Sequence, residues 1–141
     1  MRNVKVKDLM TVNPCVISPG ATLVEAARMM NDNDCGMLPV GTADNLEGIV
    51  TDRDIVLRGV AQGADLTRET VSGVMTGAVC ACNEDDYLED AALKMRANKV
   101  SRLIVRNLAG KMVGILSFGG LLRREADAIE ICSVVKHACG I

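Results

Sequence analysis

Two stretches of the chain share one pattern of hydrophobic and polar positions. The segments LVEAARMM at residues 23–30 and LEDAALKM at residues 88–95 are both apolar at their first, fourth, fifth and eighth positions. This i, i+3, i+4, i+7 spacing predicts an amphipathic helix whose apolar face packs into a core. Thr22 and Asp86, each followed by a glutamate three positions later, predict the N-terminal caps of the two helices.

Short apolar runs between polar turns surround each helix and predict β-strands. One strand is expected before each helix and two strands after it, and a second helix follows the last strand. The expected strands cover residues 15–17 and 37–40 and end at residue 50 in the first copy, and cover 79–81 and 103–105 and end at 116 in the second. The order β-α-β-β-α, written twice, predicts an α+β fold.

The amino acids repeat together with the pattern. Residues that recur 65 positions later include Val6, Met10, Thr11, Cys15, Asn33, Leu38 and Val40. After one inserted residue in the following loop, Gly48, Ile49 and Arg58 recur 66 positions later. Self-similarity at a fixed period indicates a duplicated structural module.

The repeat divides the chain into four segments. Residues 1–60 are expected to form the first repeat, residues 61–70 (AQGADLTRET) a polar linker, residues 71–124 the second repeat, and residues 125–141 a helical tail. The tail helix, expected over residues 125–139, has an apolar stripe at Ile131, Val134, Val135 and Ala138. This stripe predicts that the helix packs on the module or on a partner subunit.

Candidate chemistry lies where the last strand of each repeat meets its second helix. The first junction, GIVTDRD, carries Thr51, Arg53 and Asp54, whereas the second, GILSFGG, carries Ser117 and has Gly120 in the place of Asp54. A helix N-terminus with a hydroxyl and an arginine can meet a phosphate, and a carboxylate can accept hydrogen bonds from both ribose hydroxyls. The same residues also fit a helix cap with an acid in the first turn, which contributes about 1 kcal/mol.

Composition and charge exclude several classes of function. The net charge is −2, acids and bases are interspersed without a basic stripe, and Tyr87 and Phe118 are the only aromatic residues, so nucleic-acid binding is not expected. No apolar run approaches the ~20 residues of a membrane span. The N-terminal segment MRNVKVKDLM lacks the apolar region of a signal peptide, so a cytoplasmic protein without a membrane partner is expected.

Six cysteines and one histidine are the remaining candidates for chemistry. Their spacings do not form a zinc pattern, and small buried hydrophobic residues are the first interpretation. Cys132, His137 and Cys139 in the tail, with Cys15 or Cys80, are the alternative for a metal or redox role. A Ser-His-Asp order, a metal-ligand set and a phosphate loop are all missing from the sequence, which predicts that the protein is not an enzyme.

The duplicated Gly-Ile-Val/Leu-Thr/Ser junction, preceded each time by Met-Thr, resembles a tandem pair of CBS (cystathionine β-synthase) domains. Such a pair is called a Bateman module, and this one is similar to the stand-alone bacterial type. The resemblance covers residues 3–124. It implies two repeats packed by their sheets around a pseudo-two-fold axis, with two clefts between them, and assembly into a homodimer. It also implies an adenosine-containing ligand (AMP, ADP, ATP or S-adenosylmethionine), no required cofactor and no catalysis, but a signal passed to an unknown protein target.

The resemblance also implies which residues line the two clefts. The first cleft would be lined by Thr51, Arg53, Asp54, Gly36, Met37, Thr76, Val79, Ala81, Val100, Ser101 and Arg102. The second would be lined by Thr11, Val16, Cys35, Gly36, Ser117 and Gly120. Because Gly120 replaces the acid and Phe118 a polar neighbour, only the first cleft is expected to bind ribose. A ligand-free interaction or scaffold protein, and a thiol- or metal-responsive protein, are the alternative functions.

Overall fold

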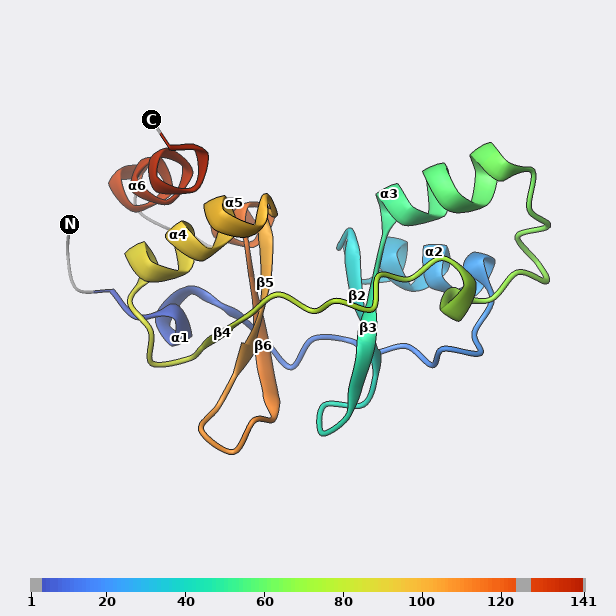
Figure 1. Ribbon diagram of the computed structural model, residues 1–141, viewed down its shortest axis with the longest axis horizontal. Helices are drawn as coiled ribbons and strands as arrows, with labels where there is room; N and C mark the ends of the chain where they lie inside the picture. The colour runs from blue at the N-terminus through green and yellow to red at the C-terminus, as the bar shows by residue number, and fades with distance from the viewer. Residues whose placement is uncertain (1–3, 124–127, 141) are drawn as a thin grey trace. The chain divides into compact units, whose positions relative to one another are not determined.

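The computed structural model of the protein describes residues 4–123 and 128–140. The chain forms two compact units, which we name after the residue at the strand–helix junction of each (Figure 1). The Asp54 unit consists of Pro14–Val79, and the Gly120 unit consists of Met1–Asn13 together with Cys80–Ile141. Each unit is described by itself.

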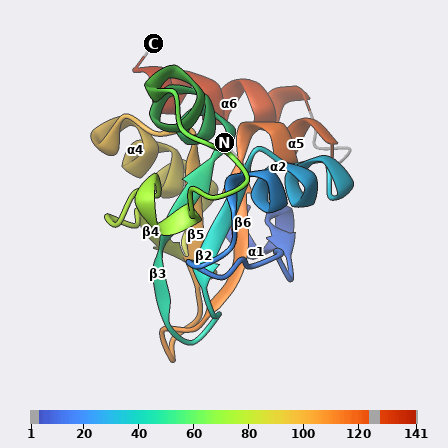
Figure 2. The ribbon, with the colours of Figure 1, turned by 90° about the vertical axis from the view of Figure 1, so that its right-hand side faces the viewer.

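The Asp54 unit is built from one long helix, one hairpin and a second helical segment. Its elements are α2 (Leu23–Asp32), β2 (Met37–Gly41), β3 (Leu46–Thr51), α3 (Asp52–Asp54), the π-helical turn η1 (Ile55–Gly59) and the 3₁₀ turns η2 (Val60–Gln62) and η3 (Val71–Gly73). Strands β2 and β3 pair antiparallel (Figure 2), and Met37 lies opposite Thr51. The core buries the apolar face of α2 against the hairpin, and Leu23, Leu38, Val40 and Val50 are fully buried there.

The Gly120 unit repeats this arrangement with a larger sheet. Its elements are α1 (Val6–Leu9), β1 (Thr11–Val12), β4 (Ala81–Asn83), α4 (Leu88–Asn98), β5 (Arg102–Arg106), β6 (Met112–Ser117), α5 (Phe118–Arg123) and α6 (Ala128–Cys139). The strand order is β1-β6-β5-β4, and β4 pairs with β5 in parallel while the other pairs are antiparallel. Helix α6 packs beside α4 (Figure 1), and the side chain of Val134 is buried in this core. The α+β fold and the C-terminal helix are therefore confirmed.

Each sequence repeat contains a Met-Thr segment, Met10-Thr11 in the first and Met75-Thr76 in the second. Each segment packs on the strand of the other repeat that carries the junction glycine, β6 with Gly114 or β3 with Gly48. Thr76 donates its N–H to the carbonyl of Ile49 at 2.8 Å and accepts the N–H of Ile49 at 3.0 Å, and Thr11 lies opposite Ile115. A Cβ atom at Gly48 would lie 2.5 Å from the Thr76 carbonyl oxygen. The compact units therefore differ from the sequence repeats 1–60 and 71–124, because the start of each repeat pairs with a strand of the other.

Two local expectations are wrong. The strand expected over residues 15–17 is reduced to a single bridge between Ile17 and Val40, and its counterpart begins only at Ala81. Thr22 caps α2 as expected by accepting a hydrogen bond from the Glu25 N–H at 3.2 Å. Asp86 does not cap α4, because its carboxylate accepts from the Asn83 N–H at 3.0 Å and closes the preceding turn instead.

The segment expected to be a polar linker, residues 61–70, is tied to α2. The backbone N–H of Leu23 donates to the Glu69 carbonyl at 3.0 Å, and that of Val24 donates to the Leu66 carbonyl at 3.1 Å. The Leu66 side chain packs against the core. Within the described residues, no helix combines the length and the apolar character needed to cross a membrane.

Candidate functional site

The first strand–helix junction is a reciprocal helix cap. Thr51 has an extended backbone (φ −116°, ψ 161°) and accepts the Asp54 N–H on its Oγ1 at 3.0 Å. Asp54 in turn accepts the Thr51 N–H on its Oδ2 at 3.0 Å. The two bonds satisfy two of the backbone donors that a helix start leaves without a partner. The cap interpretation of Thr51 and Asp54 is confirmed, and their role in ligand binding stays a prediction.

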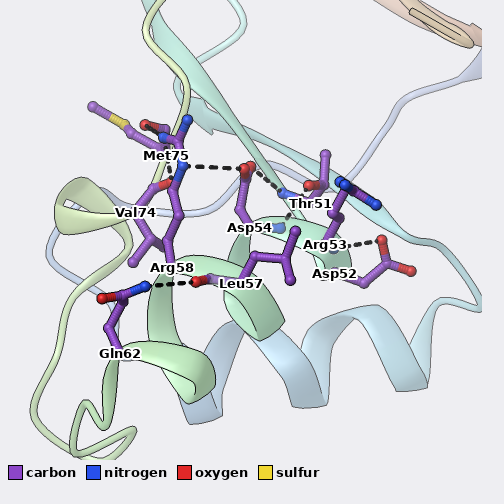
Figure 3. A network of polar contacts seen from close by, with 9 residues as sticks. All are labelled: Thr51, Asp52, Arg53, Asp54, Leu57, Arg58, Gln62, Val74 and Met75. Carbon is purple, nitrogen blue, oxygen red and sulfur yellow. Dashed lines mark hydrogen bonds and ion pairs between the residues drawn. The ribbon is translucent and has the colours of Figure 1, made fainter.

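The Asp54 carboxylate keeps free hydrogen-bonding capacity after it has formed the cap. Its side chain is 13% exposed, and its Oδ1 lies 3.9 Å from Nε of Arg58, which is too far for a strong hydrogen bond from this arginine (Figure 3). An ionised carboxylate offers about four acceptor positions, of which the Thr51 N–H occupies one. Capping and ribose binding are therefore compatible in the same side chain.

Other predicted site residues of the Asp54 unit gather at this junction. The Gly36 carbonyl accepts the Asp52 N–H at 3.0 Å, which holds the chain before β2 against the start of α3. Met37 lies opposite Thr51 in the hairpin and is buried. Arg53 is exposed beside them. The structure thus brings Gly36 and Met37 next to junction residues that lie 14 or more positions later in the sequence.

Thr76 is connected to the same junction through the chain that precedes it. Arg58 Nη1 donates to the carbonyl oxygens of Val74 at 3.3 Å and Met75 at 3.4 Å, and Thr76 itself pairs with Ile49. Val79 lies half-buried at the end of the unit. Sequence analysis missed Arg58 as a site residue. Its spacing of four from Asp54 and its recurrence as Arg124 were the available signals.

The remaining residues predicted for the first cleft belong to the Gly120 unit. Ala81 begins β4 and lies opposite Ile104, and Val100 packs against the core. The Ser101 carbonyl accepts the Phe118 N–H at 3.4 Å, and Arg102 lies opposite Ser117. The part of Ala81, Val100, Ser101 and Arg102 in a shared cleft stays a prediction.

The second junction has the hydroxyl of the cap and no carboxylate. Ser117 Oγ accepts the Gly120 N–H at 2.9 Å, as Thr51 does for Asp54. A Cβ atom at Gly120 would lie 3.0 Å from Ser117 Oγ and 3.2 Å from Thr11 Oγ1. The structure therefore brings Thr11, Ser117 and Gly120 together, whereas Val16 and Cys35 belong to the Asp54 unit. This junction offers hydroxyl groups and no anionic acceptor for ribose.

Within the described residues no disulfide joins the six cysteines, and they lie in different environments. Cys82 is buried as expected of a small hydrophobic residue, and burial raises the pKa of its thiol to about 11. Cys15, Cys132 and Cys139 are exposed, so for them this expectation is wrong. His137 Nε2 lies 3.1 Å from Glu89 Oε1. In the part of the chain that the structure describes, no group of three or more His, Cys, Asp or Glu residues could hold a metal ion.

Comparisons with known proteins match both repeats. The family model of the CBS domain matches residues 6–60 and 71–127. The CBS domain-containing protein YhcV of Bacillus subtilis (strain 168) is 39% identical over 116 residues, which are 82% of this chain and 81% of the relative.

Two solved structures are similar over most of their length. One is the crystal structure of Hypoxic Response Protein I with two coordinated zinc ions, which has 29% sequence identity and a TM-score of 0.73. The match covers 86% of this chain and 98% of the chain in that structure. The other is the CBS domain protein PAE2072 from Pyrobaculum aerophilum complexed with AMP, which has 27% sequence identity and a TM-score of 0.76. The match covers 92% of this chain and 99% of the chain in that structure.

Proposed function

The chain belongs to the CBS domain family as a tandem pair of repeats, and on that premise we propose that it is a non-catalytic regulatory module for an adenosine-containing ligand. AMP, ADP, ATP and S-adenosylmethionine are the candidate ligands. The module would pass the ligand signal to a protein target in the cytoplasm. The observation that carries the proposal is the Asp54 carboxylate, which is held in place by its cap and keeps free acceptor positions.

The proposed binding mode assigns a separate part of the ligand to each charged residue. Asp54 would accept hydrogen bonds from the two ribose hydroxyls, which carry no charge and need an acceptor when they leave water. Arg53, exposed one position earlier, would meet the phosphate as a charged donor. The AMP bound to PAE2072 supports a ligand that carries both groups.

A thermal-shift assay tests this proposal. The purified protein is titrated with AMP, ADP, ATP and S-adenosylmethionine, and with zinc in a separate series. A ligand at a hundred times its dissociation constant stabilises the folded state by about 2.7 kcal/mol, which raises the melting temperature measurably. No shift with any adenosine compound would favour the scaffold function, and a shift with zinc alone would favour the metal-responsive one.

We also propose that the protein is a homodimer. The helical segment that follows Asp54 exposes an apolar stripe, in which Val56 is 53% exposed, Leu57 44% and Val60 54%. Exposed apolar patches of this kind are typical of protein interfaces, and a two-fold dimer buries the same patch on both copies.

Sedimentation equilibrium is expected to give twice the chain mass of 15.0 kDa. The double substitution Val56→Lys and Val60→Lys is expected to give the monomer mass, because it places buried charges in the interface. Leu108→Lys is the matched control, since Leu108 is 90% exposed in a turn outside the stripe. A wild-type protein that sediments as a monomer would contradict the proposal.

A further inference from the structure

Arg58 connects the Asp54 carboxylate to the chain that leads to Thr76. Its Nε lies 3.9 Å from Asp54 Oδ1, and its Nη1 donates to the carbonyl oxygens of Val74 and Met75 at 3.3 and 3.4 Å (Figure 3). These contacts use two of the three nitrogen atoms of one guanidinium group, Nε and Nη1. The side chain of Arg58 is 56% exposed, whereas that of Asp54 is 13% exposed, so the arginine is the more solvent-exposed partner of the pair.

The contacts of residue 58 fit the shape of a guanidinium group, and a positive charge alone would not make them all. A guanidinium is planar and presents five N–H donors in a fixed fork, so it can bond two carbonyl oxygens and still face a carboxylate. A lysine ammonium at the same position is a compact point charge on a flexible stem. The capping bond from the Thr51 N–H fixes only Oδ2 of Asp54, and the guanidinium is placed to restrain Oδ1.

We propose that Arg58 is a positioning residue for Asp54 and thereby determines the preference of the site for ligands with a ribose 2′,3′-diol. This inference rests on the proposed function and deepens it. The capping bond holds Oδ2, and the ion pair with Arg58 limits the rotation of the carboxylate before the ligand arrives, while Oδ1 keeps its acceptor positions. Binding then costs less side-chain entropy, which is how preorganisation raises affinity. The gain applies only to a ligand that hydrogen-bonds to the carboxylate.

Isothermal titration calorimetry with a matched pair of ligands tests the inference. AMP carries the diol, and 2′,3′-dideoxy-AMP has the same base and phosphate without it. In the wild-type protein we expect a strong preference for AMP. In Arg58→Gln we expect up to about tenfold weaker AMP binding, because the unrestrained Asp54 carboxylate must then be ordered when the ligand binds. We expect less than about twofold change for dideoxy-AMP, since that ligand makes no bond to Asp54. Arg58→Lys, the conservative variant, should lose about threefold for AMP, because it retains the charge and not the fork.

The matched control is Arg68→Gln, because Arg68 also pairs with an acid on its own segment (Nε to Asp65 Oδ2, 3.8 Å) and is 87% exposed. It should leave both affinities unchanged. Equal losses for AMP and dideoxy-AMP in both Arg58 variants would show that Arg58 acts only through the fold, and the inference would be wrong. A wild-type protein that binds both ligands equally would also overturn it while the proposed function survives. A wild-type protein that binds neither would remove the proposed function and the inference together.

Discussion

Asp54→Asn is expected to weaken AMP binding by about a hundredfold, because the charge is lost and the one amide oxygen is held by the cap, which leaves an NH2 donor in the place of the carboxylate oxygen that would accept from ribose. The fold should survive the change. An asparagine retains one oxygen that can accept the Thr51 N–H, which Asp54 accepts at 3.0 Å. The ion pair that is lost with Arg58, at 3.9 Å and half-exposed on the arginine side, is worth at most about 1 kcal/mol. Calorimetric titration gives the affinity, and urea denaturation gives the free energy of unfolding.

Asp52→Asn is the matched control for this prediction. Asp52 is an exposed acid on the same turn, and its Oδ1 accepts the Arg53 N–H at 2.9 Å. The two variants change the net charge equally, so a general electrostatic effect would weaken AMP binding in both. We expect wild-type affinity in Asp52→Asn. An AMP affinity in Asp54→Asn equal to that of the wild type would place the ligand away from this junction.

Asp54→Ala separates the cap from the ligand contact. Alanine removes the acceptor for the Thr51 N–H as well as the carboxylate, and loss of such a cap costs about 1 kcal/mol of stability. If the ligand contact is the main role of the carboxylate, the Ala and Asn variants lose similar AMP affinity and differ in stability. This comparison is needed because the sequence pattern Thr51-x-x-Asp54 fits both roles and the structure confirms the cap.

Local features of the fold were predictable because they depend on the spacing of neighbouring residues. Helices α2 and α4 follow from apolar positions at helical spacing, and Leu23 and Leu88 are buried where the pattern places them. The predicted cap at Asp86 was wrong because its carboxylate can accept either from the start of the helix that follows or from the turn that precedes it. In the structure it accepts the Asn83 N–H of the preceding turn. The strand at 15–17 was wrong because only Ile17 finds a partner, Val40, while Val16 remains 37% exposed.

Pairing over long distances was not predictable from the pattern. The sequence shows that Met-Thr and the junction glycine recur together, and it does not show that they pair across the repeats. Strand pairing depends on contacts between residues that are distant in the sequence, and the local spacing of apolar residues carries no information about such contacts. For the same reason the sequence revealed Thr51 and Asp54 as candidates and missed Arg58, whose role depends on the carbonyls of Val74 and Met75.

Because Met75-Thr76 packs against the strand that carries Gly48, we expect Gly48→Ala to lower the free energy of unfolding. A Cβ at residue 48 would lie 2.5 Å from the Thr76 carbonyl oxygen and 3.2 Å from its carbon. The carbonyl cannot move freely, because Thr76 and Ile49 exchange two backbone hydrogen bonds of 2.8 and 3.0 Å. Overpacking against a fixed backbone costs up to about 3 kcal/mol. Urea denaturation should show this decrease in the free energy of unfolding.

Gly77→Ala is the control for Gly48→Ala, since a Cβ at Gly77 meets nothing within 4 Å although it follows Thr76 directly. It should be neutral or slightly stabilising, because alanine restricts the unfolded chain. Gly114→Ala should be destabilising like Gly48→Ala, because its Cβ would lie 2.7 Å from the Thr11 carbonyl oxygen. If both junction variants were as stable as Gly77→Ala, the Met-Thr segments would not pair with the glycine strands. The pairing matters for function because it fixes the backbone of Thr76 next to the carbonyls that Arg58 binds, so Gly48→Ala should also weaken AMP binding.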